Sequence, residues 1–196
     1  MAVGHIGAVH TSGQYTARSV YRALHLGLAT SPRYECIWRS GAILKCKIFA
    51  WLAVQYRLWT SDRRARHGLQ DTTAACYTCL QEEDMVDHIL LLCPYAKEVW
   101  HLCFTEIRVT VRQPQSGDSL EPWWLQARNA ISKTDRRGFD TTVIFVAWSL
   151  WKQRNARVFG RVAQQRSPRQ LVHQIFDELK EWDEADVGGI HRFMSS

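Results

Sequence analysis

Three cysteines and one histidine in the middle of the chain have the types and the spacing of metal ligands. Cys76, Cys79, His88 and Cys93 follow the pattern C-x2-C-x8-H-x4-C. Two thiolates separated by two residues can grip one face of a tetrahedral Zn²⁺ ion, and a histidine and a third cysteine can close the other face. Four protein ligands leave no coordination position for water or substrate. We therefore expect one structural zinc ion in a chain that binds or organises a partner and does not catalyse a reaction.

The spacing alone does not fix which residue is the third zinc ligand, and the remaining cysteines are assigned to the core. His101 or Cys103 could replace His88 if the chain returned to the metal after the helix expected beyond Cys93. Six cysteines without a signal peptide indicate a reducing compartment, in which thiols bind metal instead of forming disulfides. Three cysteines outside the pattern are predicted to be small apolar core residues: Cys36, Cys46 and Cys103.

Apolar residues at helical spacing surround the zinc motif and must position it. A stripe of period four predicts a helix over 17–28, and a second helix is expected over 43–58. Thr60 can cap a short basic helix over 61–67, which Gly68 ends. Spacing and helix-start prolines predict the later helices: 95–107, one that Pro122 opens with Trp123 and Trp124, one through Phe139 and Leu150, and one from Pro168 to Trp182.

These elements define a mainly α fold. The sequence contains no convincing β-sheet pattern and no internal repeat, so we expect a small helical domain with a zinc-knuckle-like Cys3His loop, followed by a C-terminal helical hairpin. The run PQSGDS at 114–119 is the clearest linker. We therefore divide the chain into a zinc-binding domain at 1–110, a linker at 111–120 and a C-terminal helical region at 121–196.

Positive charge is concentrated before the zinc motif. Residues 1–75 contain ten Lys or Arg and three Asp or Glu, a net charge of +7, whereas residues 76–110 contain two and six, a net charge of −4. A basic surface favours contact with nucleic-acid phosphates, and a solvated helical surface is the equal alternative. The predicted nucleic-acid contacts lie around the basic helix, with one tyrosine from the zinc loop: Arg57, Trp59, Arg63, Arg64, Arg66 and Tyr77.

The zinc loop itself is acidic. Its four carboxylates, Glu82, Glu83, Asp84 and Asp87, are expected to form a solvated tip, with Asp87 orienting a zinc ligand by a hydrogen bond. Negative charge at this tip opposes direct contact between the loop and RNA, although Tyr77 could stack on a base.

A second group of aromatic and basic residues follows the apolar repeat of the C-terminal third. Trp148 and Trp151 share one side of the predicted helix, so core packing is favoured over nucleic-acid contact for this group. Arg154 and Arg157 come directly after the apolar positions, at the same helical steps of three and four.

Several other classes of protein lack their required residues here. The longest apolar stretch, Val143 to Trp151, is far shorter than a bilayer span, so we expect an intracellular protein of the nucleus or cytoplasm without membrane contact. A zinc deaminase needs an upstream H-x-E motif, and a metalloprotease helix needs H-E-x-x-H; the sequence contains neither. No small-molecule substrate is expected.

Five runs occur in a definite order: GQYTARSVYRAL (13–24), IWRSGAILKCKIFAWLAVQYRLWTSDRRARHGL (37–69), CYTC, DHILLLC and PYAKEVW. In this order they resemble the zinc-binding domain that follows the polymerase in plant non-LTR, LINE-type retrotransposon reverse transcriptases. The later AWSLWKQRNARVF (147–159) resembles the segment that often trails that domain. The resemblance implies zinc ligands at Cys76, Cys79, His88 and Cys93. It also implies a polymerase elsewhere in a full element, but this chain has no Y-x-D-D motif, so it resembles an isolated fragment or a derived host protein.

Three functional hypotheses follow. The first is a non-catalytic zinc-binding accessory domain that binds RNA or single-stranded DNA of a retroelement weakly and without sequence preference. The second is a zinc-stabilised module whose Trp-rich surface docks another protein, such as a reverse transcriptase polymerase domain. The third is a retroelement fragment without a function.

Overall fold

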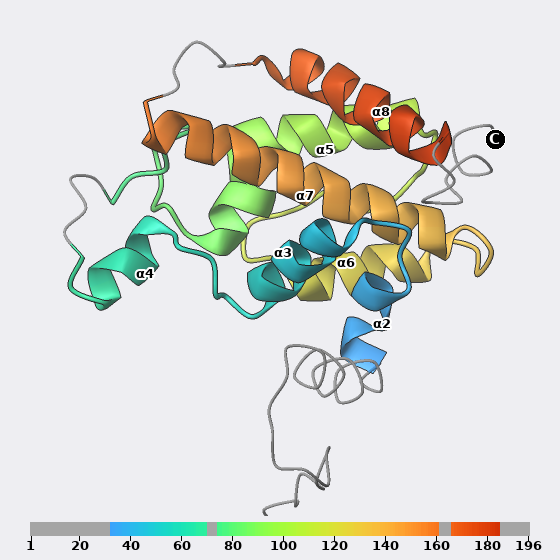
Figure 1. The fold of residues 1–196 in the computed structure, drawn as a ribbon, viewed down its shortest axis with the longest axis horizontal. Coiled ribbons are helices and arrows are strands. Elements are labelled where there is room, and N and C mark those ends of the chain that lie inside the picture. The colour runs from blue at the N-terminus through green and yellow to red at the C-terminus, as the bar shows by residue number, and fades with distance from the viewer. Residues whose placement is uncertain (1–31, 70–73, 161–165, 185–196) are drawn as a thin grey trace, which may run out of the picture.

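The fold is that of a computed structural model, which describes residues 32–69, 74–160 and 166–184 (Figure 1). The described helices, in chain order, are α2 (Pro32–Trp38), α3 (Leu44–Val54), α4 (Ser61–Arg66), the π-helix η1 (His88–Leu92), α5 (Pro94–Glu106), α6 (Leu120–Asn129), α7 (Arg136–Val158) and α8 (Pro168–Glu184). Within these ranges there is no strand, and a single antiparallel bridge joins Ala75 to Glu83. The predicted mainly α fold is confirmed.

Helix α7 is the centre of the core. It contacts α2, α3, η1, α5, α6 and α8, and every residue from 138 to 147 is buried. A helix that is apolar around its circumference is expected to be enclosed by other elements. Aromatic rings pack beside it from both halves of the chain, with Trp100 and Trp123 centroids 5.1 Å apart and Phe49 and Trp148 centroids 5.1 Å apart. Core packing of Trp148 is thus confirmed.

The predicted C-terminal hairpin is confirmed. Helix α8 runs back against α7 in the opposite direction, and it also lies along α5 (Figure 1). One continuous core therefore includes residues from both sides of the linker predicted at 111–120. The domain boundaries placed on that linker stay a prediction. The helix expected over 17–28 and the side chain of Trp182 lie outside the described residues.

Local sequence explains where several helices begin and end. Tyr56 has a φ of 55°, which ends the helix predicted over 43–58 at Val54. Gly68 follows α4 with a φ of 70°, as its role as a stop residue requires. Pro94 is the first residue of α5, and α6 begins two residues before Pro122.

The cap predicted for the basic helix is wrong in one respect. Thr60 occupies the N-cap position of α4, but its side chain makes no capping hydrogen bond to the helix. Its hydroxyl donates to the Asp62 carboxylate at 2.5 Å. The Asp84 carboxylate, from the zinc loop, accepts the Ser61 backbone N–H at 2.9 Å and so takes over the capping role.

None of the helices in the described ranges combines the length and the apolar character needed to cross a membrane.

Candidate metal centre

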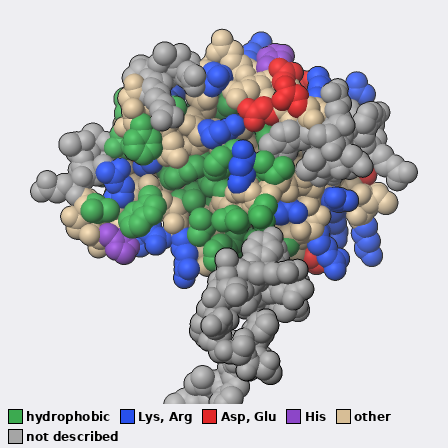
Figure 2. Space-filling model, viewed as in Figure 1, with side chains coloured by type: hydrophobic (Ala, Val, Ile, Leu, Met, Phe, Trp, Pro, Cys, Tyr) green, Lys and Arg blue, Asp and Glu red, His purple; other side chains and the backbone are tan. Residues whose placement is uncertain are grey.

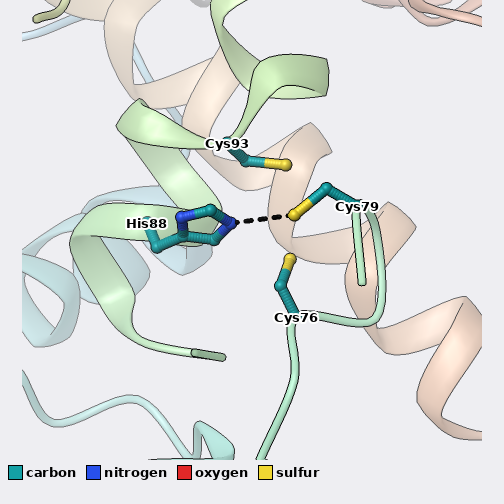
Figure 3. A group of neighbouring side chains, drawn as sticks. All are labelled: Cys76, Cys79, His88 and Cys93. Atoms are coloured by element: carbon teal, nitrogen blue, oxygen red, sulfur yellow. Dashed lines mark hydrogen bonds between the residues drawn. The ribbon is translucent and has the colours of Figure 1, made fainter. Parts of the chain in front are cut away.

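The four predicted ligands come together in one cluster. The Sγ atoms of Cys76, Cys79 and Cys93 and a ring nitrogen of His88 all lie within 4.8 Å of one another. Their side chains point toward a common centre (Figure 3), and Cys79 Sγ lies 3.2 Å from His88 Nε2. His101 lies on α5, exposed to solvent and outside this cluster. Among the described residues the cluster therefore contains His88, and not its sequence alternative.

A tight turn presents the first two cysteines. The Cys76 N–H donates to the Glu82 carbonyl at 2.6 Å, and the Leu80 N–H donates to the Cys76 carbonyl at 2.9 Å. Leu80 adopts a φ of 60°, which lets the chain reverse after Cys79. The C-x2-C spacing thus places both sulfurs on the inner side of one loop.

The π-helix explains how a spacing of H-x4-C serves one metal site. Residues five apart on an α-helix point about 140° away from each other. In η1 the Cys93 N–H donates to the His88 carbonyl at 2.7 Å, an i→i+5 bond that widens the turn. His88 and Cys93 therefore lie on the same side, and Cys93 also occupies the N-cap position of α5.

Contacts within the cluster couple the titration of its members. The hydrogen bond with Cys93 is the main cause that lowers the pKa of the Cys76 thiol, opposed by desolvation and assisted by His88 and by the N–H groups of Cys79 and Thr78. The same contact raises the pKa of Cys93. Desolvation lowers the pKa of His88. Hydrogen bonds and charge from Cys76 and Cys79 together outweigh desolvation, so the pKa of His88 is raised.

The other three cysteines have the properties of core residues, as predicted. All three are buried. Burial raises the pKa of Cys36 to about 12 and that of Cys46 to about 11, and it also raises the pKa of Cys103. Cysteines buried in apolar surroundings are unreactive and pack as small apolar side chains.

A buried ion pair fastens the zinc loop to α7. Asp84 is fully buried and Arg154 is 2% exposed, and their side chains pair through Arg154 Nη2 and Asp84 Oδ2. Arg154 Nε also donates to Asp84 Oδ1 at 3.2 Å. Its guanidinium carbon lies 5.2 Å from the Tyr77 ring centroid and 5.0 Å from that of Trp151. A residue of the C-terminal region thus holds the acidic loop in place.

Two expectations for the loop carboxylates are therefore wrong. Glu82 and Glu83 are exposed, as predicted, but Asp84 is enclosed by Arg154 and Ser61 and is no part of a solvated tip. Asp87 does not orient a zinc ligand, because its oxygens accept the Tyr56 hydroxyl at 2.9 Å and the Leu120 N–H at 2.8 Å. Its role is to join the segment that follows α3 to the first residue of α6.

The residues predicted to contact nucleic acid fall into two places. Trp59 is 51% exposed beside α4, with the Arg63 guanidinium carbon 5.0 Å from its ring centroid. Arg57 and Arg66 are exposed, Arg66 is ion-paired with Asp62 on the same helix, and Arg64 is half-buried. Tyr77 belongs to the zinc loop and is half-buried under Arg154.

Sequence reasoning missed the pairing of Asp84 with Arg154, although one pattern pointed to it. Arg154 lies four residues after Leu150, where the apolar stripe of α7 continues. A charged residue at a core position needs a buried partner of opposite sign, and the acidic loop supplies one.

Comparison with known proteins agrees with this geometry. Residues 15–100 match the protein family described as zinc-binding in reverse transcriptase. This segment is a zinc-binding domain of the reverse-transcriptase type, and it contains all four clustered residues. No catalytic domain family is found in the chain.

A curated relative extends the similarity beyond this domain. The chain is 25% identical over 177 residues to an Arabidopsis thaliana protein named a "putative ribonuclease H protein". The match covers 87% of this chain but only 26% of the relative, so the chain spans about a quarter of that protein's length. No solved structure matches the chain.

Proposed function

We propose that this chain binds one structural Zn²⁺ ion through Cys76, Cys79, His88 and Cys93. The observation that carries the proposal is the mutual approach of the four donor atoms to within 4.8 Å. Zinc–sulfur bonds of about 2.3 Å in a tetrahedron place the donors about 3.8 Å apart, so donors at the 4.8 Å limit need to approach by only about 1 Å. Three sulfurs and one imidazole nitrogen form a closed donor set that zinc favours.

The role of such an ion is structural. When bound, zinc crosslinks the turn that carries the first two cysteines to η1 and to the start of α5. All four ligands come from the protein, so no position remains for a substrate or an activated water, which supports a non-catalytic domain. Cys76→Ser should remove the metal and unfold this part of the chain, because the binding energy of a structural zinc ion is folding energy.

We further propose that α4 and the residue pair Trp59 and Arg63 bind single-stranded RNA or DNA of a retroelement. Trp59 offers a half-exposed ring on which a base can stack, and α4 carries three arginines, of which Arg63 lies beside that ring. Stacking and phosphate contacts together tolerate many sequences, and they weaken steeply as salt rises. The acidic tip of the loop, Glu82 and Glu83, is left free of RNA.

A charge-reversal pair of variants tests this surface. The change Arg63→Glu, Arg64→Glu and Arg66→Glu should lower retention of single-stranded RNA at least tenfold at low salt, with the zinc content unchanged. The control carries the same change of charge at three exposed positions on α3, α7 and α8: Lys45, Arg137 and Arg169. Equal losses in both triple variants would show that overall charge, and not α4, retains the RNA.

An apolar surface supports a second candidate function, the docking of another protein. Figure 2 shows hydrophobic side chains gathered over α3 at the centre of one face. On this helix Leu44 is 45% exposed and Ile48 is 41% exposed. Binding through an apolar interface, for example with a polymerase domain, is insensitive to salt. Binding through phosphate contacts weakens as salt is added. Binding that survives an increase from 50 to 200 mM salt would favour this alternative.

A further inference from the structure

One arginine of α7 reaches the short segment between the first two cysteines of the cluster. Arg157 Nη1 donates to the Tyr77 carbonyl at 3.1 Å and to the Thr78 carbonyl at 3.0 Å. Its guanidinium carbon also lies 5.7 Å from the ring centroid of Tyr95, two residues after Cys93. Arg157 thus contacts both parts of the chain that supply sulfur ligands, from about 80 residues further along the sequence.

These two carbonyls belong to the peptide groups that face the Cys76 sulfur. In a trans peptide the C=O and the N–H point in opposite directions. The Tyr77 carbonyl belongs to the same peptide group as the Thr78 N–H, and this N–H donates to Cys76 Sγ at 3.4 Å. The Thr78 carbonyl belongs in the same way to the peptide group that carries the Cys79 N–H, and this N–H also contacts the Cys76 sulfur. A cation on the carbonyl side strengthens both N–H groups as donors on the sulfur side.

The charge of the site calls for such a cation. A Zn²⁺ ion with three thiolates and one neutral imidazole carries one net negative charge, and the cluster is largely buried. Arg154, the nearby alternative, is already neutralised by Asp84. Arg157 forms no ion pair with any described carboxylate, and its Nε is shielded from water without a hydrogen-bond partner. Its charge is thus available to the metal centre.

We propose that Arg157 is a positioning residue of the metal centre. By holding both carbonyls between Cys76 and Cys79, it turns the intervening N–H groups toward the Cys76 sulfur and offsets the negative charge of the loaded site. This inference rests on the zinc binding proposed above. It also makes α7, outside the matched residues 15–100, part of the metal-binding unit.

The test uses the full chain, loaded with Zn²⁺ or with Co²⁺ as a spectroscopic probe. Arg157→Gln removes the charge, Arg157→Lys keeps a cationic donor, and Arg137→Gln removes an exposed charge from the same helix as a control. Loss of an outer hydrogen-bond partner typically weakens metal affinity 10- to 100-fold. In chelator competition we expect that loss for Arg157→Gln, recovery to within about fivefold of wild type for Arg157→Lys, and no change for Arg137→Gln.

The cobalt spectrum separates this role from general stability. Weaker N–H donation to sulfur should move the thiolate-to-cobalt charge-transfer band of Arg157→Gln to lower energy, which a loss of helix packing alone does not do. Zinc affinity within threefold of wild type and an unmoved band would overturn the inference. If Arg157→Gln does not fold, Arg157→Lys decides, since a tenfold loss there contradicts the need for a cation. A wild-type chain that binds no zinc refutes the proposed function instead.

Discussion

Replacing Arg154 with methionine should be among the most destabilising changes that leave the zinc ligands intact. The methionine side chain retains much of the apolar stem but removes the guanidinium that pairs with Asp84. Asp84 then keeps a fully buried negative charge, with only the N–H and hydroxyl of Ser61 as described hydrogen-bond donors, each at 2.9 Å.

The expected loss in the free energy of unfolding follows from the burial of both Arg154 and Asp84. Removing one partner of a buried ion pair costs about 3–5 kcal/mol, because the remaining charge stays desolvated. For a chain of this length, each kcal/mol lowers the unfolding midpoint by about 2–4 °C, so we expect a decrease of roughly 10 °C. Arg137→Met, at an exposed position on the same helix, should change the free energy of unfolding by less than about 0.5 kcal/mol.

A double-mutant cycle isolates the pair. Asp84→Asn keeps an acceptor for Ser61 but removes the charge, so the variant with both changes should be more stable than the sum of the single losses predicts. We expect a coupling energy of at least about 2 kcal/mol. Urea unfolding of the zinc-loaded proteins, followed by tryptophan fluorescence, gives the free energy of unfolding of wild type, both single variants and the double variant. Additive losses, or a cost below about 1 kcal/mol for Arg154→Met, would refute the assignment of this pair as the tie between loop and core.

Two further predictions concern the core around α6 and α5. Burial raises the pKa of Asp140 to about 6, although Arg128 opposes the shift. Because the folded-state pKa lies above the unfolded value, the Asp140 contribution is fully present below about pH 4 and is lost as the pH rises through 6. The stability of wild type relative to Asp140→Asn should therefore fall by about 2 kcal/mol between pH 4 and 7, and a flat difference would contradict this. Trp100 is fully buried and its Nε1 donates to the Leu90 carbonyl at 2.9 Å. Trp100→Phe should cost about 2–3 kcal/mol in urea unfolding with an unchanged m-value, and a cost under 0.5 kcal/mol would show that the bond and the packing are replaceable.

Local spacing predicted the parts of the site that local chemistry determines. The turn between Cys76 and Cys79 needs only neighbouring backbone groups, and the H-x4-C spacing lies within one widened turn. Helix α5 likewise begins at Pro94, where the absence of an N–H costs nothing. These features depend on residues within about five positions of each other, which a single sequence displays directly.

Contacts over long sequence separations could not be predicted in the same way. Asp84 sits among exposed acidic residues, so composition favours solvent, and its burial depends on Arg154, 70 residues later. The same carboxylate caps α4, for which the hydroxyl oxygen of Thr60 was a plausible local acceptor. Arg157 carries no local pattern that points to the zinc loop. Each depends on the path of α7 through the core, which periodicity identifies as a helix without fixing its neighbours.

Metal content is the most direct test of the central claim. Purified under reducing conditions, the chain should contain one zinc ion per molecule, with X-ray absorption showing three sulfur neighbours at about 2.3 Å and one nitrogen at about 2.0 Å. Cys76→Ser should lose the ion, and a strong chelator should remove the ordered structure of the wild-type loop. A chain without stoichiometric zinc that keeps its full fold in chelator would contradict the account.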